Sequence, residues 1–313
     1  MVPEKPESDV SSVTGTAYIF PGQGSQYVGM GKDLFEAHPG ARHIFEHADE
    51  ILGLRLSRVC FEGPEEELKQ TKNTQPAIFV HSIAVVSVLR TGKAAMAAGH
   101  SLGEYSALVY AGALSFEDGL RLVRLRGELM HQAGIDRPGT MAAVVGLDAG
   151  AVEKVCKDAE REGVVRPANF NSPGQIVISG SVQGVRKAMQ LAKEAGAKLA
   201  KELPVSGAFH SPLMEPARAG LKAALESVEI SDAELPVYAN VTGQAVTRAE
   251  EIRRLLFEQL TSPVRWEETI TAMVAGGASR FVEIGPGKVL QNLVKRIAPA
   301  VETAGIEKAV DVG

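Results

Sequence analysis

The feature that most restricts the fold is a change in the pattern of elements in the middle of the chain. From residue 138 to residue 206 the sequence reads as strand, helix, strand, strand, helix and strand, with the turn NSPG between the two central strands. This order is the ferredoxin-like arrangement. Strands and helices alternate on both sides of it, which predicts a parallel α/β sheet. We therefore expect a small ferredoxin-like subdomain at 138–206, inserted into a large domain formed by residues 15–137 and 207–313.

The first residues, MVPEKPESDVSSVTG, are polar and contain two prolines. They lack the basic flank and apolar stretch of a signal peptide, so we expect residues 1–14 to be a disordered tail and the protein to be cytoplasmic. No apolar run is long enough to span a bilayer, which argues against a membrane partner. The formal net charge of −5 argues against nucleic acid. The two cysteines, Cys60 and Cys156, form no CxxC pair, so we expect no metal site.

Residues 99–103 read GHSLG and stand between an apolar run, AAMAA, and a segment of helical character. GxSxG at a strand-to-helix turn is the pattern of a nucleophile elbow, and it makes Ser101 the candidate nucleophile. The turn would also place Ser101 at a helix N-terminus, where main-chain N–H groups stabilise an oxyanion. The alternative is a chance glycine-rich turn, because 32 of the 313 residues are glycine.

The helix EDGLRLVRLRGELMHQ carries one arginine on its apolar side. At about 100° per residue from Leu120, the apolar side chains fall in an arc from about 140° to 300°, and Arg126 falls near 240°. Arg124 and Glu128 lie on the opposite side, at i,i+4 spacing. A guanidinium that faces a core needs an anion. Arg126 therefore either forms a structural ion pair with a buried carboxylate or binds the carboxylate of a substrate.

A nucleophilic serine needs a base, and His210 is the best candidate among the seven histidines. It stands in PVSGAFHSPLMEP, after a strand and before a helix with Ser211 at its N-cap and Pro212 at N1. Loops at the carboxyl ends of strands carry catalytic groups in α/β folds. No acid between Ser101 and His210 stands in an obvious strand-end motif, so a third catalytic member is not identified and a Ser–His dyad is one solution.

Eight segments together resemble one family: FPGQGSQ, GHSLGEYSALVYAG, RLVRLRGELM, NFNSPGQIVISG, GAFHSPLMEPA, NVTG, EQLTSPVRWEETI and EIGPGKVLQNLVKR. In this order they are similar to the malonyl-CoA:acyl-carrier-protein transacylases of bacterial fatty acid synthesis, within the acyltransferase-domain superfamily. The resemblance covers about residues 16–300. It implies an α/β-hydrolase-like large domain with a ferredoxin-like insert.

Carried over motif by motif, the resemblance assigns a role to single residues. It implies that Ser101 is the nucleophile, that His210 is the base and that Arg126 binds the malonyl carboxylate. Further roles concern the oxyanion hole, the orientation of the histidine and the choice of malonyl over methylmalonyl groups. Gln23 and the N–H of Leu102 would form the oxyanion hole. The main-chain carbonyl of Gln259 would orient the histidine, and Phe209 with the side chain of Leu102 would select malonyl.

The implied activity is a ping-pong transfer of malonyl from malonyl-CoA to the phosphopantetheine thiol of holo-acyl carrier protein, without a cofactor and by a monomer. A basic stretch on the last helix, with Lys288, Lys295 and Arg296, is a candidate contact for CoA or the carrier, or else a solvated face. Three alternatives stay open: an acyltransferase of a polyketide pathway, a serine thioesterase or esterase, and a carrier-docking module without catalysis.

Overall fold

Two β-sheets organise the chain in the computed structural model, which describes residues 15–90, 92–205 and 207–312. The tail predicted over residues 1–14 lies outside the described residues. The first sheet has six strands in the order β10-β9-β1-β2-β7-β8, and every neighbouring pair is parallel except β7 and β8. Its strands are β1 (Thr16–Phe20), β2 (Met96–Gly99), β7 (Val237–Tyr238), β8 (Ala245–Val246), β9 (Arg280–Ile284) and β10 (Glu302–Ile306).

Both faces of this sheet are buried, as in parallel sheets generally. Along β1 the side chains of Tyr18 and Phe20 enter one apolar cluster, and those of Ala17 and Ile19 enter another on the opposite face. Two helices, α12 (Trp266–Ala275) and α13 (Val289–Ile297), cover the second face. Helices that contribute to the first cluster are α1 (Lys32–Ala37), α2 (Pro39–Leu52), α3 (Leu56–Glu62), α4 (Glu65–Leu68), α5 (Thr71–Val88), α6 (Gly103–Tyr110), α7 (Phe116–Asp136), α10 (Glu215–Ser227) and α11 (Ala249–Gln259).

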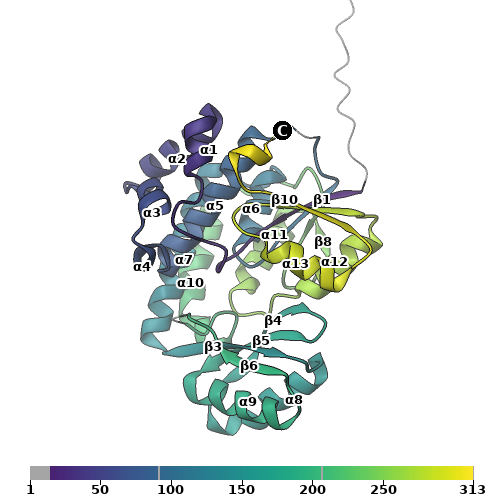
Figure 1. Cartoon of the computed structure of the whole chain (residues 1–313). Helices are drawn as coiled ribbons and strands as arrows, with labels where there is room; N and C mark the ends of the chain where they lie inside the picture. The colour runs from purple at the N-terminus through teal and green to yellow at the C-terminus, as the bar shows by residue number, and fades with distance from the viewer. Residues whose placement is uncertain (1–14, 91, 206, 313) are drawn as a thin grey trace, which may run out of the picture.

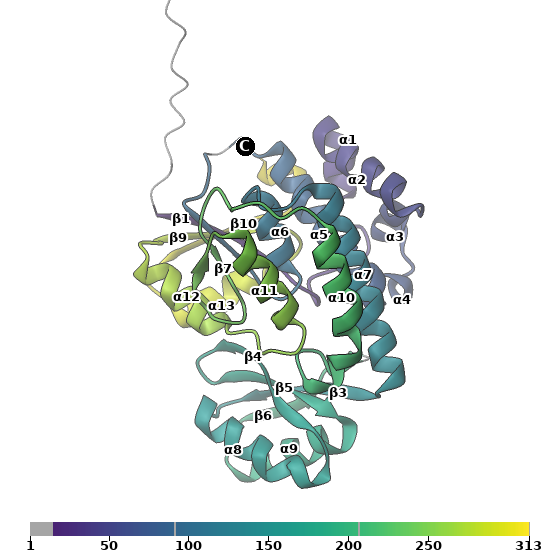
Figure 2. The ribbon, with the colours of Figure 1, turned by 180° about the vertical axis from the view of Figure 1, so that it is seen from behind.

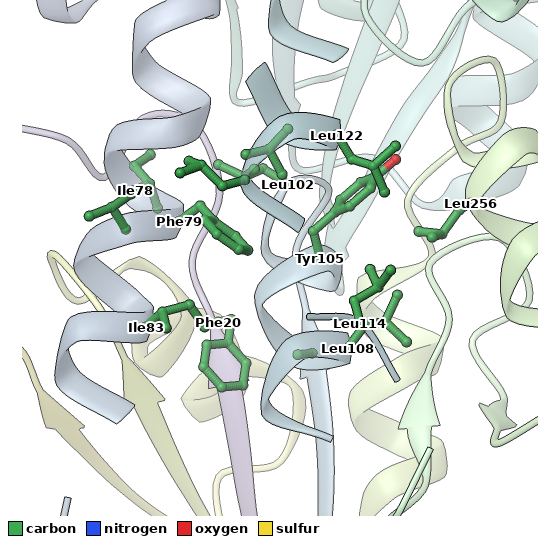
Figure 3. Close-up of a cluster of buried hydrophobic side chains, with 14 of the residues drawn as sticks. Phe20, Ile78, Phe79, Ile83, Leu102, Tyr105, Leu108, Leu114, Leu122 and Leu256 are labelled. Carbon is green, nitrogen blue, oxygen red and sulfur yellow. The ribbon is translucent and has the colours of Figure 1, made fainter. Parts of the chain in front are cut away.

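The first cluster packs directly under the turn that carries Ser101. Figure 3 shows Phe20 of β1 and the side chains of Phe79 on α5 and Tyr105 on α6 within it. Leu102 and Tyr105, which follow Ser101 in the chain, are almost completely buried there. The start of α6 is therefore anchored by apolar packing, which fixes the turn that precedes it.

The second sheet has four antiparallel strands in the order β4-β5-β3-β6. Two helices pack on one face of it around an apolar cluster of their own, and the whole unit lies at one end of the molecule (Figure 1). Along the chain the elements are β3 (Gly139–Val145), α8 (Ala149–Ala159), β4 (Val165–Ser172), β5 (Gln175–Ser181), α9 (Val182–Glu194) and β6 (Leu199–Glu202).

A short parallel bridge joins the two sheets' units. The edge strand β4 pairs with the segment that follows α11, through the Asn169–Val264 bridge. Phe170 N–H donates to the carbonyl of Val264 at 2.9 Å, and Val264 N–H donates to the carbonyl of Ala168 at 2.8 Å. Figure 2 shows β4 beneath the lower end of α11. Three 3-10 helices complete the described elements: η1 (Glu160–Glu162), η2 (Pro212–Met214) and η3 (Ala309–Asp311).

Two strands differ from what the sequence predicts. The strand expected around PVYANVTG has only two residues, since the chain turns at Asn240 and comes back as β8. The edge strand β10 was not predicted, because its half-exposed residues show no periodic apolar pattern. None of the described helices combines the length and the apolar character that crossing a membrane requires.

Candidate active site

Ser101 lies in a tight turn between β2 and α6, and its φ of +52° is in the left-handed region. Glycine is required on both sides of it by close packing. A Cβ on Gly99 would lie 1.9 Å from the main-chain carbon of Gly103, and a Cβ on Gly103 would lie 2.0 Å from the carbonyl oxygen of Phe20. The strand–turn–helix context expected for GHSLG is therefore present, and the strained backbone is of the kind found at functional sites.

His210 is brought to this turn from a loop 109 residues further along the chain. Its Nε2 lies 2.8 Å from Oγ of Ser101, the ring is buried, and its φ is +56°. Ser101 and His210 are the non-glycine residues with positive φ within the described ranges. Ser211 caps η2, as the sequence predicts, by accepting from Leu213 N–H. The two strained residues are thus the two that meet.

The far nitrogen of His210 is held by main-chain oxygens. Its Nδ1–H donates to the carbonyls of Gln259 at 3.0 Å and of Ser262 at 3.1 Å. These acceptors fix the tautomer whose lone pair is on Nε2, facing Ser101. In the described part of the chain, no hydrogen bond or ion pair joins His210 to a carboxylate. The main-chain carbonyl of Gln259, which the family resemblance implies as the group that orients the histidine, thus contacts Nδ1, the atom that an acid contacts in a Ser–His–Asp triad.

Arg126 is buried with 1% of its surface exposed, and it reaches the same serine. Its Nη2 donates to Oγ of Ser101 at 3.0 Å and to Oε1 of Gln259 at 2.9 Å, and its Nη1 donates to Oε1 of Gln75 at 2.8 Å. Among the described residues, none of the ion pairs includes Arg126. Arg124 and Glu128 pair on the other side of α7 at 2.6 Å. The guanidinium is therefore held by neutral acceptors, and within the described ranges no carboxylate contacts it directly.

The two residues predicted for the oxyanion hole follow the adjacent strands β1 and β2. Leu102 is the N-cap of α6, and its N–H makes no hydrogen bond within the described part. Gln23 follows β1, the neighbour of β2, and its Nε2 donates to Oγ1 of Thr71 at 3.4 Å. A Cβ on the adjacent Gly22 would lie 2.4 Å from the carbonyl oxygen of His100, so this loop packs against the elbow. Both predicted oxyanion residues thus lie at the carboxyl edge of the sheet.

Under the elbow lies a buried polar network that the sequence analysis missed. Asn240 accepts from Ser101 N–H at 2.6 Å and donates from Nδ2 to the carbonyl of Gly99 at 2.6 Å. Glu104 accepts through Oε2 from Asn240 N–H at 3.0 Å and from Nε2 of Gln259 at 2.8 Å. Both residues stand in quoted segments, GHSLGE and NVTG. Their partners are more than 130 residues away along the chain, so no local pattern reveals them.

Burial and charge shift the pKa values of His210, Arg126 and Glu104. Burial, followed by the charge of Arg126, lowers the pKa of His210 to about 3. Burial also lowers the pKa of Arg126, and the nearby Tyr105 and Glu104 partly restore it. Burial raises the pKa of Glu104 to about 7, although its two hydrogen bonds and Arg126 oppose the change. At neutral pH, His210 is therefore an uncharged base beside a cation.

The small sheet also contributes to the surroundings of the serine. Nε2 of His100 lies 2.9 Å from Oδ1 of Asn171 on β4. Phe209, the predicted specificity residue, is 6% exposed and precedes His210 in the chain. A cavity of about 1070 Å³ runs between α8 and α12, and His210 is part of its wall. The site thus lies where the two units meet.

The three cations expected on the last helix do not form one cluster. Lys288 is the N-cap of α13, and Lys295 and Arg296 are in its last turn, about 10 Å away at 1.5 Å per residue. Arg296 donates to Oε1 of Gln175, in the hairpin of β4 and β5. Within the described ranges, no group of three or more His, Cys, Asp or Glu side chains could hold a metal ion.

Taken together, these groups can transfer an acyl group that carries an anion. Ser101 is placed to attack, His210 to take its proton, and Arg126 to bind a negative charge next to the bond that forms. Arg126 donates to one lone pair of the Ser101 oxygen, so the hydroxyl hydrogen is directed toward His210.

Known proteins share this sequence and fold. The family described as "Acyl transferase domain" matches residues 17–313. The malonyl CoA-acyl carrier protein transacylase of Bacillus subtilis is 50% identical over 293 residues, which is 93% of this chain and 92% of that protein. An acyl carrier protein S-malonyltransferase from Vibrio cholerae has a similar structure, with a TM-score of 0.92 and 44% identity, covering 95% of this chain and 98% of that one.

A further structural match includes a carrier. It is a malonyl-transacylase in complex with its type II polyketide synthase acyl-carrier protein, with a TM-score of 0.92 and 42% identity, covering 96% of this chain and 98% of that one.

Proposed function

This chain belongs to the acyl transferase domain family, and we propose that it moves a malonyl group from coenzyme A to the thiol of an acyl carrier protein through a malonyl ester on Ser101. The observation that carries the proposal is the position of Oγ of Ser101, 2.8 Å from Nε2 of His210 and 3.0 Å from Nη2 of Arg126. One contact supplies the base, and the other supplies the cation that an acyl group with a free carboxylate needs.

In the first half-reaction, His210 takes the proton of Ser101 as its oxygen attacks the malonyl thioester carbonyl. N–H groups of Leu102 and Gln23 stabilise the oxyanion. The carbon–sulfur bond then breaks, and His210 gives its proton to the departing thiolate of coenzyme A, which leaves as a thiol. The lowered pKa keeps His210 uncharged at neutral pH, so that its lone pair is free to accept the first proton, and the imidazolium then releases that proton readily.

In the second half-reaction, the phosphopantetheine thiol of the carrier attacks the malonyl ester. His210 takes the proton of that thiol, the ester carbon–oxygen bond breaks, and Ser101 recovers its proton from His210. Every electron pair and proton is assigned to a protein or substrate group, so we propose that the reaction needs no cofactor.

Arg126 is the proposed reason for choosing malonyl over acetyl. Malonyl brings a carboxylate that can pair with the buried guanidinium, whereas acetyl leaves the cation without a counter-ion. Phe209 would oppose an α-methyl branch by its bulk. For a contact with coenzyme A or the carrier, we propose Lys288, Lys295 and Arg296, all of which are exposed.

We class the large unit as α/β-hydrolase-like and the unit around the antiparallel sheet as ferredoxin-like, on the strand orders given above. We also propose a cytoplasmic monomer that acts in fatty acid synthesis.

Labelling with radioactive malonyl-CoA tests the function. We expect label on wild-type chain, none on Ser101→Ala, and rapid transfer of the label when holo-acyl carrier protein is added. Loss of the label to water at the same rate with and without carrier would favour a thioesterase, and an unlabelled wild type would favour a docking module without catalysis.

A further inference from the structure

One buried carboxylate next to the site has no role in the steps above. Glu104 is 2% exposed and stands three residues after Ser101, at the start of α6. Its Oε2 accepts two hydrogen bonds, from Asn240 N–H at 3.0 Å and from Nε2 of Gln259 at 2.8 Å. A buried carboxylate is costly unless it balances a charge or holds a neighbour in place. Glu104 is placed to do both.

Gln259 connects this carboxylate to Arg126. Its Oε1 accepts from Nη2 of Arg126 at 2.9 Å, and its Nε2 donates to Glu104 at 2.8 Å and to the carbonyl of Ser101 at 3.0 Å. With the amide turned over, its donors would face the guanidinium and its acceptor would face the carboxylate. The charges of Arg126 and Glu104 therefore select one amide orientation.

That orientation matters because Gln259 also holds the base. Its main-chain carbonyl accepts from Nδ1–H of His210, and its side-chain Nε2 donates to the main-chain carbonyl of Ser101. The interposed amide also separates the two charges. A direct ion pair with Glu104 would occupy the fork of Arg126, whereas the amide leaves the guanidinium available to a substrate carboxylate.

Resting on the proposed function, we propose that Glu104 is a positioning residue for malonyl transfer. It fixes the Gln259 amide, and through it the directions of Arg126 and His210. In its ionised form it also provides a buried negative charge opposite Arg126. The sequence left open a structural ion pair for Arg126. In the structure the Gln259 amide lies between Arg126 and Glu104, and we assign this bridged pair a role in substrate selection as well as in stability.

Two substitutions separate the hydrogen bonds from the charge. Glu104→Ala removes both, whereas Glu104→Gln can keep an acceptor for Asn240 and Gln259 and removes only the charge. Glu283 offers a matched control, because it is also fully buried, its pKa is also raised to about 7, and it accepts from two main-chain N–H groups and a glutamine amide. It lies on β9 and holds the start of α13.

The experiment measures kcat and KM for malonyl-CoA and acetyl-CoA, with melting temperatures, for the Ala and Gln variants at both positions. We expect Glu104→Ala to lower kcat for malonyl about a hundredfold, as misplaced catalytic groups do, and to narrow the malonyl-to-acetyl ratio. Glu104→Gln should recover most of kcat. It should also lower KM for malonyl-CoA alone, because Glu104 no longer competes with the substrate for the charge of Arg126.

The Glu283 variants should lower the melting temperature and leave the malonyl-to-acetyl ratio unchanged. The inference would be overturned if the malonyl-to-acetyl ratio were the same in the Glu104 variants, the Glu283 variants and wild type. If Glu104→Ala does not fold, Glu104→Gln decides alone, since an unchanged KM for malonyl-CoA would count against it. Failure of wild type to take the malonyl label overturns the proposed function, whereas labelled wild type with unaltered Glu104 variants overturns only this inference.

Discussion

The main-chain carbonyl of Gln259 lies 3.0 Å from Nδ1 of His210, so the catalytic histidine is oriented by a dipole and not by a carboxylate. An acid at this position would stabilise the imidazolium and raise its pKa. The carbonyl orients the ring with much less effect on its charge, and the neighbouring guanidinium opposes protonation. The result is a base that stays neutral far below the ordinary histidine range.

Acylation of Ser101 should persist at acidic pH. An unperturbed histidine with a pKa of about 6.5 is about 97% protonated at pH 5 and would be inactive as a base. Because the pKa of His210 is lowered to about 3, we expect kcat/KM for malonyl-CoA to persist at pH 5. Arg126→Ala removes a repelling cation, so the acid limb should move to higher pH, and Arg124→Ala should leave it in place. Rates of enzyme acylation between pH 4 and pH 8 measure both. Because the pKa of Glu104 is raised to about 7, the profile of Glu104→Gln is compared, and an acid limb near 6.5 in both wild type and Glu104→Gln would refute the assignment.

Arg126→Ala should also change substrate choice. Hydrogen bonds to charged groups contribute about 1.5 to 3 kcal/mol, so we expect malonyl transfer to fall roughly tenfold to a hundredfold or more relative to acetyl. The comparison is kcat/KM for malonyl-CoA and acetyl-CoA. Arg124→Ala is the matched control on the same helix, because Arg124 pairs with Glu128 on the opposite side. Equal discrimination in wild type and Arg126→Ala would show that Arg126 is structural.

The elbow should not tolerate a methyl group at Gly99. A Cβ there would lie 1.9 Å from the main-chain carbon of Gly103, and the backbone cannot yield without moving α6. Overpacking of this kind lowers the free energy of unfolding by about 3 kcal/mol or more, so Gly99→Ala should have a lower melting temperature or fail to fold. Gly150→Ala is the control, because its Cβ would have only Asp148 Oδ1 near it, at 3.7 Å. Circular dichroism melts that coincide for the two variants would contradict the packing argument.

Phe209→Ser should widen the range of acyl groups. Removing the ring leaves room for an α-methyl branch, so the ratio of kcat/KM for methylmalonyl-CoA to that for malonyl-CoA should rise. The change should come mainly from faster methylmalonyl transfer, with Arg126 still binding the carboxylate. A ratio that stays constant would place the choice of acyl group elsewhere.

Charge reversal on α13 tests the proposed contact with coenzyme A or carrier. Lys288→Glu and Arg296→Glu should each raise KM for one of these two anionic partners, and the effect should weaken with salt. Lys222→Glu on α10 is an exposed control away from this helix. Unchanged KM values for both partners would leave these cations as a solvated face.

The sequence predicts those parts of the site that depend on local pattern. The elbow follows from glycines, an apolar strand and a helix in succession, and Arg126 is found because α7 is regularly amphipathic. His210 follows from its place between a strand and a capped helix. The role of Gln259 was predicted only from the family resemblance, because every residue type has a main-chain carbonyl and the sequence does not show which one accepts from His210.

Glu104, Asn240, Gln75 and Asn171 could not be placed from the sequence. Each acts through a hydrogen bond to a residue more than 50 positions away, and such bonds have no period. The length of β7 and the existence of the half-exposed strand β10 could not be predicted for a related reason. Their positions depend on the neighbouring strands more than on their own side chains.

The bridge between β4 and Val264 has a consequence for engineering. It lies within the same segment, 259–264, whose carbonyls orient His210. A chimera that takes its small sheet from a relative would therefore replace the edge strand that pairs with the segment supporting the catalytic base. Compatible donors are those whose edge strand keeps the backbone register at this bridge, and sequence identity elsewhere in the small sheet is a secondary criterion.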